Sequence, residues 1–103
     1  MIMRIWRGFT READKDIYFE YIKETGLQEY ASIPGNRGAW TLRRVRGGKA
    51  EFLVISLWDS YDAIRMFAGN DYEKAVYYPE DDRFLLEREP YVGHYEVLSR
   101  LGS

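Results

Sequence analysis

One stretch near the middle of the chain is hydrophobic on both faces of a strand. From Phe52 to Trp58 the only polar residue is Ser56. Successive side chains of a strand point to opposite faces of its sheet, so a strand with one face in water would alternate apolar and polar residues. The pattern predicts a strand over Ala50–Trp58 that is covered on both faces. In a chain this short one layer of helices covers one face, and a second copy of the chain is the expected cover for the other.

The N-terminal part predicts a strand followed by a long helix. Met3–Phe9 is rich in β-branched and aromatic residues, which favours a strand, and the polar segment Thr10–Asp14 is able to cap a helix. Apolar residues at spacings of three to five then predict an amphipathic helix from about Ala13 to Tyr30, in which Gly26 is a position for shortening or bending. The predicted apolar face of this helix consists of Ile17, Tyr18, Tyr21, Ile22 and Leu27.

The central part predicts a hairpin followed by a second helix. Ile33–Asn36 breaks the first helix, and Arg37–Arg46 resumes as a strand. The pair Gly47-Gly48 is typical of a tight turn into the Ala50–Trp58 strand, because glycine tolerates positive φ. Asp59 or Ser60 can then cap a second helix that carries Ala63, Ile64 and Phe67 and ends at Gly69.

The C-terminal part predicts a further helical piece over Asp71–Tyr78, a short turn near Glu80–Asp82 and, after Pro90, a last strand over Tyr91–Leu98. The order of elements becomes strand, helix, strand, strand, helix, strand. This order predicts a ferredoxin-like α+β fold, βαββαβ, with a four-stranded antiparallel sheet and its helices on one face. We expect residues 1–103 to form a single domain.

Composition narrows the range of partners. A net charge of -2 provides no field that would attract nucleic acid or an anionic membrane. The absence of cysteine excludes disulfides, thiolate nucleophiles and cysteine-ligated metals. No apolar run approaches the length of a membrane span, and charges near the start are unlike a signal peptide, so we expect a cytoplasmic protein. The 17 aromatic residues, 9 of them Tyr, favour an interface or a pocket for a flat organic ligand.

Three motifs resemble the antibiotic biosynthesis monooxygenase family. They are Leu57-Trp-Asp-Ser-Tyr-Asp-Ala63, Phe67-Ala-Gly-Asn-Asp-Tyr72 and His94-Tyr-Glu-Val97, and the similarity spans roughly Met3 to Leu98. The resemblance implies a dimeric α+β barrel, in which two copies associate through the sheet face. It also implies an oxidoreductase that needs no cofactor and oxidises phenolic, polyketide-like molecules to quinones with oxygen.

Some members of the family degrade haem, and the resemblance argues against that activity here. Those members share a pattern of three residues: an Asn on the first strand, a Trp near the end of the second helix and a His ten residues later. In this chain Phe67 stands at the Trp position and Tyr77 at the His position, and the first strand carries no Asn. We therefore do not expect haem cleavage.

His94, the only histidine, is the first candidate for catalysis. In the expected sheet order the last strand lies beside the first, which brings His94 within reach of Arg4 or Trp6. A neutral imidazole there could act as general base toward a phenol, because its ordinary pKa lies near working pH. The alternative is a structural histidine at the sheet edge or the dimer interface.

Three tyrosines after the second helix are the next candidates. Tyr72 and Tyr77 are predicted to donate a hydrogen bond to a substrate oxygen, and Tyr78 is predicted to contact the substrate. The alternative is that these tyrosines line a core or an interface.

The predicted substrate-binding group is completed from other elements. Trp6 and Phe67 could stack on an aromatic ring, and Arg4 could hold an acidic phenol or carboxylate through its paired donors. Arg4 could equally be an ordinary exposed arginine near the N-terminus.

Two charged clusters predict no site. Arg43, Arg44, Arg46 and Lys49 surround the hairpin tip and are typical of a solvated strand end, since no overall basicity supports nucleic-acid binding. The acids of Glu80–Asp82 lack the spaced ligands of a calcium loop and favour the positive end of a short helix. We expect no metal site.

The leading hypothesis is a cofactor-independent monooxygenase of an aromatic small molecule. The alternatives are a non-catalytic dimeric protein that binds a metabolite or serves a structural role, and a polyketide cyclase or isomerase. Oxygen consumption separates the first hypothesis from the other two.

Overall fold

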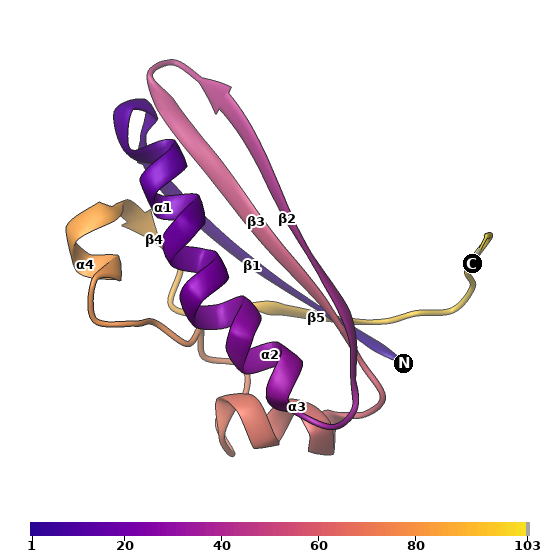
Figure 1. Ribbon diagram of the computed structural model, residues 1–103. Helices are drawn as coiled ribbons and strands as arrows, with labels where there is room; N and C mark the ends of the chain where they lie inside the picture. Colours follow the sequence, from indigo (N-terminus) through magenta and orange to yellow (C-terminus); the bar gives the residue numbers. More distant parts are fainter. Residues whose placement is uncertain (103) are drawn as a thin grey trace.

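The computed structural model describes residues 1–102 as an antiparallel sheet with its helices packed on one face (Figure 1). This arrangement confirms the predicted ferredoxin-like α+β fold. The elements are β1 (Ile2–Arg11), α1 (Lys15–Ile22), α2 (Gln28–Ser32), β2 (Asn36–Arg46), β3 (Lys49–Trp58), α3 (Tyr61–Ala68), α4 (Asp81–Phe84), β4 (Leu85–Arg88) and β5 (Gly93–Glu96).

The fourth position of the sheet is filled by two short strands instead of the single predicted one. The sheet has the order β2-β3-β1-β4, and β5 also pairs with β1. β4 pairs with Gly8–Thr10 of β1, whereas β5 pairs with Ile2–Ile5. Pro90 lies between the two strands and has no backbone N–H to continue a ladder. The predicted strand Tyr91–Leu98 is therefore shorter than expected, and an unpredicted strand precedes it.

The first helix is continuous but carries a π-helical turn at Lys23–Leu27 between α1 and α2. Gly26, the predicted position of a bend, lies in this turn. The predicted role of Ile17 is wrong, because its side chain is 58% exposed. Ile17 lies about 100° around the helix axis from its neighbour Tyr18, and only Tyr18, Ile22 and Tyr30 of this helix are buried.

Two local predictions near helix ends differ in outcome. The prediction of a polar cap at Thr10–Asp14 is wrong, because β1 continues to Arg11 and no side chain caps the 3₁₀ turn Glu12–Asp14 that follows. The predicted cap of α3 is confirmed, since the Ser60 hydroxyl accepts a hydrogen bond from the amide of Ala63 at 3.2 Å. Gly69 ends α3 with a φ of 84°, as predicted.

The predicted helix over Asp71–Tyr78 is wrong. The segment makes one turn, in which the Lys74 amide donates to the Asp71 carbonyl at 3.1 Å, and then bonds to the chain around Pro90. The amide of Ala75 donates to the Pro90 carbonyl, and the amide of Val92 donates to the Glu73 carbonyl, each at 2.9 Å. These long-range bonds take the donors and acceptors that a helix would use. After the turn the segment therefore has irregular backbone, with one isolated bridge between Lys74 and Tyr91.

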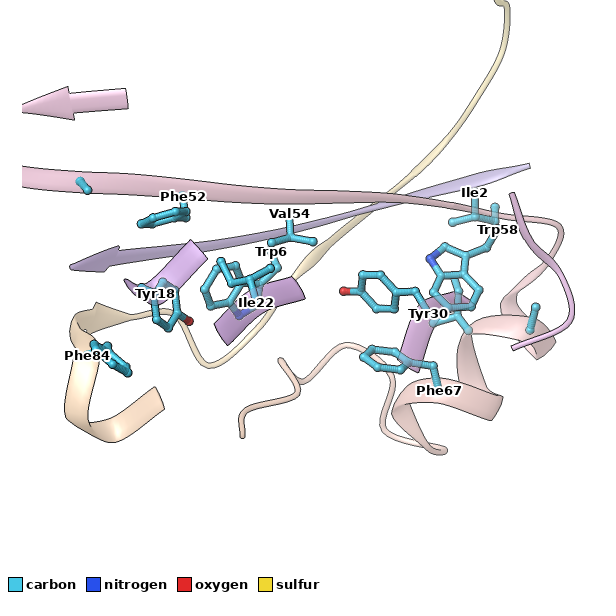
Figure 2. Close-up of a cluster of buried hydrophobic side chains, with 13 residues drawn as sticks. Ile2, Trp6, Tyr18, Ile22, Tyr30, Phe52, Val54, Trp58, Phe67 and Phe84 are labelled. Atoms are coloured by element: carbon cyan, nitrogen blue, oxygen red, sulfur yellow. The ribbon is translucent and has the colours of Figure 1, made fainter. Parts of the chain in front are cut away.

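The core lies between the sheet and the helices. Figure 2 shows Phe52 and Val54 of β3 and Trp6 of β1 facing the aromatic rings of the first helix.

The other sheet face lacks a covering layer within residues 1–102. On this face the strand register places together Met3, Ile5, Trp40, Leu42, Leu53 and Ile55. Only one of the two covers expected for β3 is thus supplied by the chain itself. None of the helices in this described part has the length and hydrophobicity to cross a bilayer.

Candidate functional site

A cleft opens between the first helix and the sheet. Its cavity volume is about 40 Å³. A ligand larger than a few waters therefore requires the wall to move. The lining residues are Arg4, Trp6, Tyr18, Ile22, Thr25, Gly26, Tyr30, Val54, Phe67, Val76, Tyr78 and Asp81.

Arg4 brings a buried guanidinium to this cleft. The residue is 1% exposed. Its Nη1 donates to the Tyr72 carbonyl at 2.6 Å, and its Nη2 donates to the Lys74 carbonyl at 3.3 Å. The Nε of the same group is buried without a partner in residues 1–102. Burial lowers the pKa of Arg4, the neighbouring Tyr30 hydroxyl opposes this shift, and none of the three groups bonded to the guanidinium is a carboxylate.

Trp6 brings a second unpartnered donor. It is two residues from Arg4 on the same face of β1, and its indole Nε1 is buried and makes no hydrogen bond of normal geometry within residues 1–102, although the Tyr77 hydroxyl is nearby. The indole lies over Gly8, where an added Cβ would come within 2.5 Å of the ring. Glycine at this position is therefore what allows the tryptophan to lie flat beside the sheet.

His94 contacts Arg4 and lies outside the cleft lining. The two residues pair across β1 and β5, and Nη1 of Arg4 lies 2.9 Å from Nε2 of His94. The rings of Tyr72 and Tyr61 pack against the imidazole at centroid distances of 5.3 and 6.0 Å. Burial, together with the charge of Arg4, lowers the pKa of His94 to about 4. The imidazole is therefore neutral at ordinary pH, with one nitrogen occupied.

Tyr78 forms part of the cleft wall, whereas Tyr77 does not line the cleft. The Tyr78 hydroxyl donates to the carboxylate of Glu29 on α2, and burial and this neighbouring charge raise the pKa of Tyr78. The Tyr77 hydroxyl donates to the Glu89 carbonyl, while its ring lies edge-on to Trp6 at 6.2 Å. Burial also raises the pKa of Tyr77.

Asp81 is a buried carboxylate in the cleft that sequence reasoning missed as a site residue. It is 3% exposed. One oxygen accepts the Tyr18 hydroxyl at 2.8 Å, and the other accepts the Tyr78 amide at 2.6 Å. Both recorded partners are uncharged. Sequence holds no signal that separates Asp81 from the exposed acids Glu80 and Asp82 beside it.

The structure divides the predicted site residues into two groups. The four predicted substrate-binding residues Arg4, Trp6, Phe67 and Tyr78 all line the cleft. The three residues predicted to be catalytic do not line it, although Tyr72 and His94 both contact Arg4. Tyr18 and Tyr30 also line the cleft and were missed as ligand-binding residues; their helical spacing with Ile22 was the available signal. Within residues 1–102 no group of three potential ligands is arranged to hold a metal ion.

Comparison with known proteins finds similarity in structure only. No protein-family profile matches the chain. No curated protein matches it in sequence. Among solved structures, one from Bacillus cereus, assigned provisionally as an antibiotic biosynthesis monooxygenase, is 19% identical, with a TM-score of 0.69 over 99% of this chain and 97% of that one.

The haem degrader MhuD of Mycobacterium tuberculosis, solved with two haems in its active site, matches with a TM-score of 0.62 and 19% identity over 99% of this chain and 100% of its own. A mutant of MhuD with two manganese protoporphyrin IX molecules per active site reaches a TM-score of 0.64 at 19% identity, with both chains fully covered. At this level of identity the likeness concerns the fold alone. The chain therefore has the fold of the antibiotic biosynthesis monooxygenases, in agreement with the resemblance of its motifs.

Proposed function

We propose that this protein is a cofactor-independent monooxygenase that acts on a flat, phenolic small molecule bound in the cleft. The observation that carries the proposal is the pair of buried, unpartnered donors, Arg4 Nε and Trp6 Nε1, in a cleft with aromatic walls. An unsatisfied buried donor costs about 1–3 kcal/mol. A bound ligand with acceptor oxygens would remove that cost, and the aromatic rings would pack on its faces.

Arg4 would stabilise the negative charge that develops on the substrate. A buried guanidinium that faces an aromatic cleft interacts with an oxyanion more strongly than one in water. In the proposed reaction the substrate loses a proton, and its anion reacts directly with oxygen. One oxygen atom enters the product as a carbonyl, and the other leaves as water with two substrate hydrogens.

His94 and Tyr72 would act as positioning residues of Arg4. The sequence suggested His94 as the general base, but its Nε2 accepts a hydrogen bond from Arg4 and its low pKa makes it a weak base. Together with the Tyr72 carbonyl it holds Nη1 of Arg4, so that Nε is directed elsewhere. Tyr77 would support Trp6 through its ring.

The functional unit would be a homodimer formed through the open sheet face. The apolar side chains gathered there by the strand register include Trp40, which is 45% exposed, and Leu42, which is 46% exposed. A flat sheet face that carries such side chains favours a second, self-complementary sheet.

The test is oxygen uptake with a panel of anthrones and hydroquinones, with product identification. Arg4→Gln is expected to reduce the rate at least about 100-fold, the loss typical of removing a charged stabiliser of an oxyanion. His94→Ala is expected to reduce it less, and Met66→Gln, on the exposed side of α3, to leave it unchanged. A panel that consumes no oxygen but yields a cyclised or isomerised product would replace this proposal with the cyclase alternative. Stable binding without conversion would indicate a binding protein.

Haem degradation is a second candidate because two of the similar structures are MhuD with porphyrins bound. The residues present do not fit a haem iron well. The sole histidine lies outside the cleft lining, and its Nε2 is occupied by Arg4. A haem titration is expected to give no saturable shift of the Soret band, and a stoichiometric shift would restore this candidate.

A further inference from the structure

The cleft contains two buried charges that do not pair with each other. The guanidinium of Arg4 is bonded to two carbonyls and a neutral imidazole, and the carboxylate of Asp81 is bonded to a hydroxyl and an amide. Burying one unpaired charge is expensive, and burying two of opposite sign without joining them is more so. Such an arrangement is expected where a ligand makes the missing contacts.

The two charges belong to opposite ends of the cleft. Arg4 lies over the ring of Phe67, 5.6 Å from its centroid, and Asp81 accepts from Tyr18. Figure 2 shows Tyr18 and Phe67 on opposite sides of Trp6 within the aromatic cluster. An acceptor is thus required at one end of a ligand and a donor at the other.

We infer that Asp81 is the proton acceptor of this site and that the ligand is a hydroxylated aromatic ketone, with its hydroxyl at Asp81 and its carbonyl at Arg4 and Trp6. Each carboxylate oxygen has two lone pairs, so both oxygens of Asp81 keep an acceptor position after binding Tyr18 and Tyr78. The inference rests on the proposed function and specifies its substrate and its base.

The proton step follows from this placement. The ligand O–H bond breaks, its proton joins an oxygen of Asp81, and the electron pair stays on the ligand. Where hydroxyl and carbonyl are conjugated through the ring, the charge spreads to the carbonyl oxygen, where Arg4 Nε and Trp6 Nε1 can donate to it. Asp81 would thus accept the proton at one end of the ligand, and Arg4 would stabilise the resulting negative charge at the other end.

Three single-ring probes test the inference by binding, without oxygen chemistry. 4-Hydroxyacetophenone has the donor and the acceptor, 4-methoxyacetophenone lacks the donor, and 4-ethylphenol lacks the acceptor. The wild-type protein is expected to bind the first at least about tenfold more tightly than either of the others, since each missing group leaves a charged partner unsatisfied. Titration calorimetry or the near-ultraviolet spectrum of the phenol provides the affinity.

The variants assign each preference to one residue. Asp81→Asn is expected to remove the preference for hydroxyl over methoxyl and to retain the preference for ketone over ethyl, and Arg4→Gln to do the reverse. Asp82→Asn is the matched control, because Asp82 bonds only to Arg88 at the surface and should leave both preferences unchanged.

Asp81→Asn also disturbs two hydrogen bonds, so Tyr18→Phe provides a second variant if the first does not fold. It keeps the carboxylate and removes one of its two hydrogen-bond donors. The preference for the hydroxyl over the methoxyl probe should persist in this variant, because the carboxylate of Asp81 is still present.

The outcomes separate the two proposals. Equal binding of hydroxyl and methoxyl probes by the wild type would overturn the role of Asp81 and leave a binding or oxygenase function standing. Failure of all three probes to bind, together with no oxygen uptake from the larger panel, would overturn the proposed function itself.

Discussion

Arg4 and His94 face each other across paired strands, with Nη1 of the guanidinium 2.9 Å from Nε2 of the imidazole. A guanidinium has donors only, so the imidazole accepts this hydrogen bond as a neutral ring. Protonation of His94 would remove the bond and place two cations side by side. The pair therefore links the geometry of the cleft to pH.

The stability of the protein should fall as the pH drops from about 6.5 to about 4. The pKa of His94 is lowered to about 4 in the folded chain from its ordinary 6.5. Between these values the unfolded chain binds more protons, so the free energy of unfolding rises with pH across this window and levels off above it. Urea denaturation at several pH values measures the slope.

His94→Gln is the control for this pH dependence. Its amide oxygen can accept from Arg4 but does not titrate. The variant should lose less stability than the wild type between pH 6.5 and pH 4, while carboxylates elsewhere contribute equally to both. Parallel curves for the two proteins would show that the histidine does not couple to folding.

Gly8→Ala and Gly26→Ala should change stability in opposite directions. The new Cβ at Gly8 would lie 2.5 Å from the Trp6 ring, which is an overpacked contact and is expected to cost about 1–3 kcal/mol. At Gly26 the nearest atom, in the ring of Tyr78, is 3.9 Å away, and alanine in a helix is expected to stabilise by about 0.5–1 kcal/mol. Thermal denaturation of both variants measures the two effects. If Gly8→Ala did not lose stability, the result would contradict the tight packing of Trp6 on Gly8.

Trp40→Lys should weaken the proposed dimer at least about tenfold without unfolding the chain. Trp40 is 45% exposed in the single chain, so its loss costs little folding energy, whereas a charge buried within a sheet interface is unfavourable. Sedimentation at micromolar concentration compares the two proteins. Met66→Lys is the matched control, since Met66 is 63% exposed on α3, away from the open face. A wild-type protein that sediments as a stable single chain would remove the dimer from the proposal.

Tyr78→Phe should lower the free energy of unfolding by at most about 3 kcal/mol. The change removes the hydroxyl that donates to the charged Glu29 and leaves the ring in the cleft wall. It should leave the preference of the cleft for a hydroxylated probe unchanged. Calorimetric titration with 4-hydroxyacetophenone and 4-methoxyacetophenone provides the comparison. Loss of the preference in this variant would indicate that Tyr78, and not Asp81, recognises the hydroxyl.

The sequence by itself determined the strand and helix pattern and one side of the site. The apolar run through Phe52 and the Gly47-Gly48 turn predict the central hairpin, because local periodicity and turn chemistry depend on neighbouring residues. The expected order of strands also predicts that His94 lies near Arg4, as observed. These features follow from local preferences and a small set of allowed topologies.

Only the tertiary structure decided the rest. The segment Asp71–Tyr78 has the pattern of a helix but bonds to the chain around Pro90, and the carboxylate of Asp81 is buried although its neighbours Glu80 and Asp82 are exposed. The first outcome depends on backbone bonds to Pro90 and Val92, and the second depends on the hydroxyl of Tyr18. These partners are distant in the chain, and no local pattern encodes them. The same holds for Arg4, whose burial and free Nε depend on three separate elements meeting at one end of the cleft.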